Sequence, residues 1–143
     1  MKVLFVCQRN NGRSQLAKAL FNLRAGSNDA ASAGLTVDVP GQTLAERAQT
    51  EGSDVGKVIE VMKELGVDVR GYERTPFDEQ MIKDYDKVVF ILEQTPKLSP
   101  NSDRTKIETW HISDPKQKDL DGVRQTREEI DLRVARLVRQ KKH

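Results

Sequence analysis

The chain has 143 residues, of which 36% are hydrophobic and 32% are charged. A formal charge of only +2 argues against a dedicated nucleic-acid binder. One cysteine cannot form an internal disulfide and a zinc cluster needs several ligands, so we expect a reduced, cytoplasmic setting. The apolar run MKVLFV is too short for a signal peptide or a membrane span. We therefore predict one domain over residues 1–143, with no metal, cofactor, nucleic-acid partner or membrane contact.

Blocks of apolar residues predict strands and helices in alternation. In chain order these are a strand at 2–6, a helix from Ser14 to Gly26, a strand end at 31–34, a loop at 35–53 with a helical turn in 43–49, a helix through 55–65 ending at Gly66, a short strand at 67–69, a helix at 77–85, a strand at 86–92, a loop at 95–104, a strand at 106–112 and a helix with its apolar stripe at 123–138. This order is typical of an α/β protein with a short, about four-stranded parallel sheet and helices on both faces.

In such sheets ligands bind at the carboxyl ends of strands. The stretch CQRNNGRS, residues 7–14, begins at one such end, and SDPKQ, residues 113–117, begins at another. We expect both segments to face one site.

Residues 7–14 join the first predicted strand to the first helix. Backbone N–H groups of such a turn lack partners and can surround an anion, helped by the positive end of the helix. Three loop residues are of types that tolerate the left-handed backbone that such a cradle needs, namely Asn10, Asn11 and Gly12. Gln8 and Arg9 complete the predicted substrate-binding loop; the Arg9 side chain either binds an acidic substrate or projects into solvent.

The side chains of this loop suit attack on a tetrahedral oxyanion. Inward N–H groups stabilise Cys7 as a thiolate, which is a ready nucleophile. Arg13 can hold two oxygens of the anion bidentately. Ser14 can hydrogen-bond the sulfur. A buried strand-end cysteine followed by a helix-capping serine is the alternative, and the joint spacing disfavours it.

The loop resembles the C-x5-R-S loop of the low-molecular-weight protein tyrosine phosphatases and the related arsenate reductases. The resemblance continues at SAG (32–34), ELGVDV (64–69) and DP (114–115) and covers nearly the whole chain.

This resemblance implies roles for individual residues. Cys7 would be the nucleophile and Arg13 the oxyanion clamp. Asn10 would hold the left-handed turn, Ser14 would stabilise the thiolate, and Ser32 would brace the loop from behind.

The resemblance also implies that Asp114 is the general acid. Independently, a thiolate that attacks a phosphate monoester expels an oxyanion that a nearby carboxylic acid must protonate. Asp114 follows a strand end and precedes Pro115. Asp119 and Asp121 are the competing candidates.

Several positions depart from the phosphatase pattern. Gly12 stands where many phosphatases of the family carry a second cysteine, and Lys116 and Gln117 stand where pocket tyrosines are usual. The loop at 35–53 has no aromatic residue, which leaves Tyr72 as the candidate pocket wall. Two further features, the GRSQ segment and a tryptophan before HISDP, are more similar to the arsenate reductases.

We predict a phosphatase that acts through a phosphocysteine on Cys7, with protein phosphotyrosine as the substrate that the resemblance implies. The alternative is a single-cysteine arsenate reductase that uses an external thiol. A third hypothesis is an oxyanion-binding module without turnover.

Overall fold

The computed structural model describes residues 1–140, so Lys141, Lys142 and His143 lie outside the described residues. Its elements are β1 (Val3–Cys7), α1 (Arg13–Ala25), β2 (Ala30–Gly34), α2 (Leu44–Ala48), α3 (Val55–Lys63), the 3-10 helix η1 (Glu79–Asp84), β3 (Lys87–Leu92), the 3-10 helix η2 (Arg104–Lys106), β4 (Ile107–His111) and α4 (Leu120–Gln140). No helix within the described part is long and apolar enough to cross a membrane.

The four strands form one parallel sheet in the order β2-β1-β3-β4. Strand β1 is central, and all five of its residues are buried, as expected for a strand that is covered on both faces. Its last residue, Cys7, pairs with Gly34 at the end of β2. The carboxyl ends therefore meet at one edge, which is the predicted position of the site.

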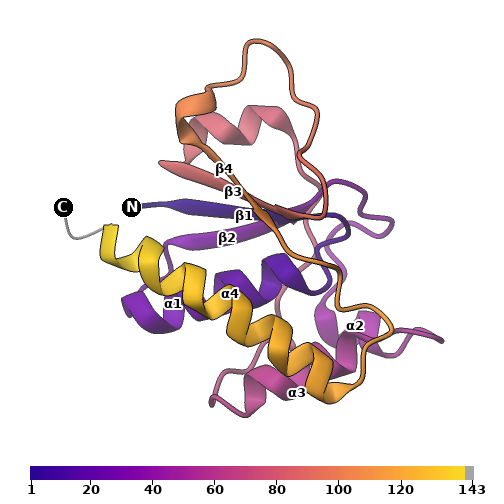
Figure 1. Cartoon of the computed structure of the whole chain (residues 1–143). Helices are drawn as coiled ribbons and strands as arrows, with labels where there is room; N and C mark the ends of the chain where they lie inside the picture. Colours follow the sequence, from indigo (N-terminus) through magenta and orange to yellow (C-terminus); the bar gives the residue numbers. More distant parts are fainter. Residues whose placement is uncertain (141–143) are drawn as a thin grey trace.

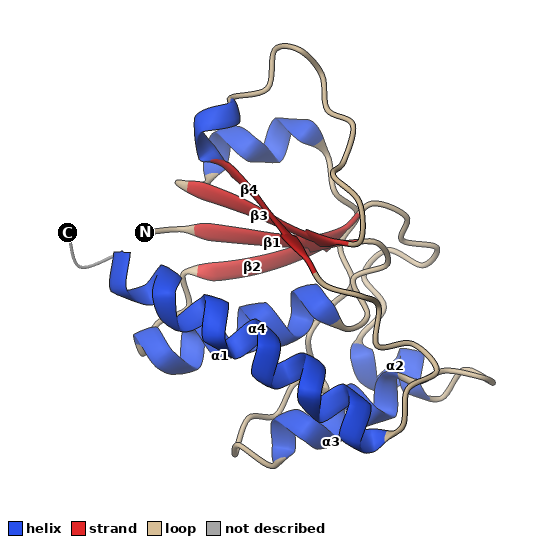
Figure 2. Cartoon of the chain, viewed as in Figure 1, coloured by secondary structure: helices blue, strands red, loops and turns tan. Residues whose placement is uncertain are grey.

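Helices lie on both faces of the sheet (Figures 1 and 2), and an apolar core packs against each face. On one face, Val3 and Phe5 of β1 pack in a large core with residues of α1, α3 and α4. On the other face, Leu4 and Val6 pack in a smaller core with Ile82 of η1. The α/β prediction is thus confirmed, with helices on both faces; the second face carries the short 3-10 helices η1 and η2 and the loop between β3 and η2 (Figure 1).

Two predicted elements were wrong. Residues 67–69 are not a strand, because Val67 closes the capping turn of α3 and the two residues after it have no regular structure. Gly66 is left-handed (φ 77°), its N–H bonds the Lys63 carbonyl, and the N–H of Val67 bonds the Met62 carbonyl, which is the Schellman pattern. Because this turn reverses the chain, Leu65, the last residue of the predicted helix at 55–65, is 42% exposed.

The predicted helix at 77–85 is the six-residue 3-10 helix η1. The Asp78 carboxylate caps it by accepting from the N–H of Gln80. An apolar pattern this short does not distinguish an α-helix from a 3-10 helix.

Candidate active site

Five residues connect the last residue of β1, Cys7, to the first residue of α1, Arg13. Within them Asn10 adopts a left-handed backbone (φ 60°), and Gly12 is the N-cap of α1. Ser14 was predicted to begin and cap this helix, but it lies in the first turn and its hydroxyl makes no capping bond. The loop therefore turns tightly between two rigid elements.

Asn10 is fully buried and fixes the loop through three hydrogen bonds. Its Nδ2 donates to Ser14 Oγ (2.7 Å), and its Oδ1 accepts from the backbone N–H of Thr75 (2.8 Å). Its carbonyl accepts from Gln15 Nε2 (3.1 Å). These bonds offset the cost of a left-handed, non-glycine residue.

Ser32 reaches this network through a residue that sequence reasoning missed. Its hydroxyl donates to Gln15 Oε1 (2.8 Å), and Gln15 Nε2 donates in turn to the carbonyls of Asn10 and Glu73. Gln15 is fully buried. Ser32 is thus placed behind the loop, as expected, with Gln15 between the two.

Arg74 is a second brace that sequence reasoning missed. It is 1% exposed, and its Nε and Nη2 donate to the carbonyl of Arg9 at 3.4 and 3.2 Å. Its Nη1 contacts Gln42 Oε1 and Asp38 Oδ1, both at 2.7 Å. The Arg74 guanidinium lowers the pKa of Asp38 by hydrogen bonding. Arg74 thus fixes the loop backbone at Arg9.

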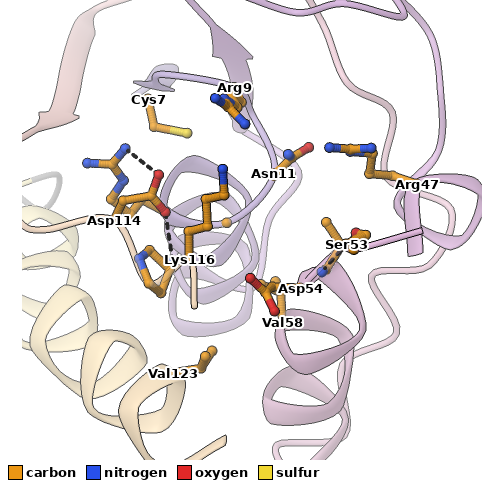
Figure 3. A pocket seen from close by; sticks show the side chains of 15 residues that line it. Cys7, Arg9, Asn11, Arg47, Ser53, Asp54, Val58, Asp114, Lys116 and Val123 are labelled. Atoms are coloured by element: carbon orange, nitrogen blue, oxygen red, sulfur yellow. Dashed lines mark hydrogen bonds and ion pairs between the residues drawn. The ribbon is translucent and has the colours of Figure 1, made fainter. Parts of the chain in front are cut away.

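The sulfur of Cys7 lies 3.0 Å from Ser14 Oγ, and Cys7 is 2% exposed. Since the Ser14 hydroxyl already accepts from Asn10, its hydrogen is available for donation to the sulfur of Cys7. Cys7 lines an open pocket of about 120 Å³ (Figure 3).

Arg13 lines the same pocket and is 4% exposed. Its Nη1 donates to the carbonyl of Ile112 (2.9 Å), and its Nη2 lies 3.7 Å from Asp114 Oδ2. The guanidinium is therefore oriented by a fixed carbonyl beyond β4. The long ion pair leaves Nη2 free to bind an incoming anion.

Of the three aspartates considered as the acid, Asp114 alone lines the pocket. Asp119 Oδ1 accepts from the N–H of Gly122 near the start of α4, and Asp121 pairs with Arg124. The Asp114 side chain is 41% exposed, and its Oδ1 accepts from the N–H of Lys116 (2.9 Å). The structure thus brings Asp114 to Cys7 and Arg13, although about a hundred residues of sequence separate it from them.

The segment that carries Asp114 is attached to the start of α3. Gln117 has a left-handed backbone (φ 68°), and its N–H donates to Asp54 Oδ2 (2.8 Å). Lys57 Nζ donates to the carbonyl of Lys118 (2.6 Å). The N–H of Gln117, followed by Lys57, lowers the pKa of Asp54, so Asp54 holds this segment as a carboxylate.

The other predicted binding residues divide into two groups. Arg9, Asn11 and Gly12 line the pocket, whereas the side chain of Gln8 donates to Thr36 Oγ1 (3.0 Å) on its outer side. Tyr72, the predicted aromatic wall, packs instead against the core beneath Lys18. Pocket residues that sequence reasoning missed include Arg47, Ser53, Asp54 and Val58.

The arrangement has the parts for nucleophilic attack on a tetrahedral oxyanion. It offers a buried thiol, a buried guanidinium and a partly exposed carboxyl group, all lining one pocket. In residues 1–140, no group of three or more His, Cys, Asp or Glu side chains is placed to hold a metal ion.

Residues 2–143 match the family model described as low molecular weight phosphotyrosine protein phosphatase. The chain belongs to this family. One relative, named glutaredoxin arsenate reductase, from Synechocystis sp. (strain ATCC 27184 / PCC 6803 / Kazusa), is 31% identical over 140 residues, 96% of this chain and 95% of that protein. The solved arsenate reductase from Archaeoglobus fulgidus DSM 4304 is 32% identical (TM-score 0.73; 96% and 98% of the two chains). The low molecular weight protein tyrosine phosphatase from T. tengcongensis is 25% identical (TM-score 0.75; 98% and 99%).

The predicted membership of the low-molecular-weight phosphatase and arsenate reductase superfamily is thus confirmed. Its relatives are named for both activities, and the names leave open whether this member is a hydrolase or a reductase. That distinction depends on the groups in and around the pocket.

Proposed function

We propose that this low-molecular-weight phosphatase family member hydrolyses phosphate monoesters through a phosphocysteine on Cys7. The observation that carries the proposal is the convergence of Cys7, Arg13 and Asp114 on one pocket, in a chain with no second cysteine. Hydrolysis needs one thiol, an anion clamp, an acid and water, all of which this chain and its solvent supply.

In the first step Cys7 Sγ attacks phosphorus, the bond from phosphorus to the leaving oxygen breaks, and Asp114 protonates that oxygen. Arg13 and the loop N–H groups stabilise the charge on the three remaining oxygens. In the second step water attacks phosphorus, the Asp114 carboxylate takes a proton from the water, and the Cys7 thiolate leaves. Ser14 stabilises that thiolate through its hydroxyl.

The pocket favours a broader substrate class than phosphotyrosine. No aromatic side chain of the described residues lines it, and cationic side chains and a few aliphatic groups take that place. A phenyl ring would therefore find no stacking partner. We infer that the enzyme accepts esters with non-aromatic leaving groups.

Turnover of two aryl phosphates tests the proposal. Wild type should hydrolyse 4-nitrophenyl and phenyl phosphate, and Cys7→Ser should hydrolyse neither. In Asp114→Asn, kcat/KM should fall ~10²–10⁴-fold with phenyl phosphate, because its leaving group needs a proton. The fall in kcat/KM should be clearly smaller with 4-nitrophenyl phosphate. If wild type is no faster than Cys7→Ser, the hydrolase proposal fails.

A second candidate function is arsenate reduction, which the names of the relatives favour. Cys7 would displace hydroxide from arsenate and form a sulfur–arsenic bond. An external thiol would then attack Cys7 Sγ, and the bonding pair would leave with arsenic as arsenite. A second external thiol would reduce the mixed disulfide, so two thiols become one disulfide while arsenic gains two electrons.

Arsenate-dependent consumption of a small thiol tests this candidate, with Cys7→Ser as the control. Thiol consumption without aryl phosphate turnover would replace the hydrolase with the reductase. If both reactions are absent while inorganic phosphate still raises Tm, the third hypothesis, a binding module without turnover, is supported.

A further inference from the structure

One side of the pocket carries polar groups that the proposed hydrolysis does not use. Four of them, here called the rim cluster, are Arg9 and Asn11 of the loop, Arg47 of α2 and Lys116 of the segment after Asp114. In Figure 3, Arg47 extends toward Asn11, and the amine of Lys116 points across the pocket toward the loop. The cluster thus lies beyond Cys7, where the leaving group of a bound ester would lie.

Two atoms of the rim cluster lack partners. Asn11 Oδ1 and Arg47 Nε are both buried and make no hydrogen bond within the described residues. Proteins rarely bury such groups without a hydrogen-bond partner. An unpaired donor and an unpaired acceptor in the same pocket indicate a ligand that supplies their hydrogen-bond partners.

The charge of the pocket is also unbalanced. Arg9, Arg13, Arg47 and Lys116 line it against two carboxylates, those of Asp54 and Asp114. Asp54 is occupied by the N–H of Gln117 and by Lys57, and Asp114 lies on the side of Arg13. Within residues 1–140, Arg9, Arg47 and Lys116 make no ion pair shorter than 4 Å. Arg47 lies near enough to Asp38, and Lys116 near enough to Asp54, to lower the pKa of those carboxyl groups electrostatically. Neither cation pairs with them directly, so each can still bind a second negative group.

The rest of the pocket wall limits the kind of molecule that can carry the second negative group. Val58, Pro115 and Val123 supply aliphatic contacts, and the pocket is small. A short aliphatic chain fits these walls, and a terminal carboxylate fits the cations.

We propose that the rim cluster is a second anion subsite, and that the substrate is a phosphate monoester whose aliphatic leaving group carries a carboxylate. This inference rests on the proposed hydrolase function. Arg47 binds the carboxylate through its guanidinium, Lys116 adds a second positive charge, and Asn11 accepts from a hydroxyl or amide of the same group.

Three phosphonates of equal chain length test the subsite without turnover: 3-phosphonopropionate, propylphosphonate and 3-aminopropylphosphonate. Calorimetric titration of wild type should give about tenfold tighter binding for the carboxylate than for the neutral compound, and the weakest binding for the amine. Arg47→Gln should reduce the ratio of carboxylate to neutral affinity severalfold. Lys116→Gln, at an exposed position, repeats the test if Arg47→Gln does not fold.

Arg136→Gln is the matched control, because Arg136 is exposed on α4, 13 residues beyond the pocket residue Val123. It should leave the affinity ratio unchanged. Equal affinities for the three phosphonates in wild type, or no binding of any of them, would overturn the subsite. A carboxylate preference that persists in both rim variants would also overturn it. If the carboxylate preference depends on Arg47 but the protein hydrolyses no phosphate ester, the subsite is supported and the proposed hydrolase function is rejected.

Discussion

Replacing Gly34 by alanine should disable the loop without touching a functional side chain. Gly34 ends β2 beside Cys7, and its missing side chain leaves room for the loop backbone. A Cβ at this position would lie 2.8 Å from the carbonyl carbon of Arg9, 2.8 Å from the nitrogen of Asn10 and 2.9 Å from the Cβ of Asn10. Ordinary contact begins at 3.4 Å, so the loop has to move by roughly 0.6 Å.

The size of the effect follows from that displacement. The loop is braced by Asn10, Gln15 and Arg74, so it cannot shift without straining several hydrogen bonds. Overpacking of this kind costs about 1–3 kcal/mol of stability. A misplacement approaching 1 Å at a reaction centre can cost about 10²-fold, so we expect kcat/KM to fall by ~10–100-fold.

Steady-state hydrolysis of 4-nitrophenyl phosphate, well below the Tm of the variant, measures this effect. Gly71→Ala is the matched control, because a Cβ there meets nothing within 4 Å and the backbone has no positive φ. It should retain wild-type kcat/KM. Wild-type activity and stability in Gly34→Ala would refute the argument that loop backbone position depends on this contact.

Three further substitutions test other parts of the site. Asn10→Ala removes two side-chain bonds from a buried left-handed residue; urea unfolding should show a loss of about 1–3 kcal/mol, and an unchanged midpoint would contradict the brace. Arg13→Lys should fold normally but bind inorganic phosphate at least tenfold more weakly in calorimetry, because an ammonium group cannot bind bidentately; equal affinity would count against the clamp. Since hydrogen bonding lowers the pKa of Asp54, its contribution is present above the unfolded value of about 3.9 and is lost as pH falls through the native value. The stability difference between wild type and Asp54→Ala should therefore be largest near neutral pH and shrink below about pH 4, and a difference independent of pH would reject this role.

The loop at 7–13 and the sheet could be predicted because their signals are local. The spacing from Cys7 to Arg13 and the strand before it lie in one short segment. Alternation of apolar blocks predicted the parallel order, and the topology then placed Asp114 at the same edge.

The braces and the rim were missed because long-range contacts leave no local pattern. Arg74 lies in a segment whose sequence is typical of a surface loop. It is nevertheless buried against the carbonyl of Arg9, 65 residues earlier. Arg47 lies in the long polar loop at 35–53, where nothing in the sequence indicates that α2 faces the pocket. The wrong strand at 67–69 has a related cause, because its apolar residues serve the capping turn of α3 and the core.

Trapping of the covalent intermediate tests the central proposal most directly. Asp114→Asn retains Cys7 and Arg13 but lacks the group that activates water, so acid quenching during turnover of 4-nitrophenyl phosphate should leave the enzyme phosphorylated. Intact-protein and peptide mass spectrometry should then locate one phosphoryl group on the peptide that contains Cys7, and Cys7→Ala should show none. Turnover with no phosphoryl group on that peptide, or with one on another residue, would contradict Cys7 as the nucleophile.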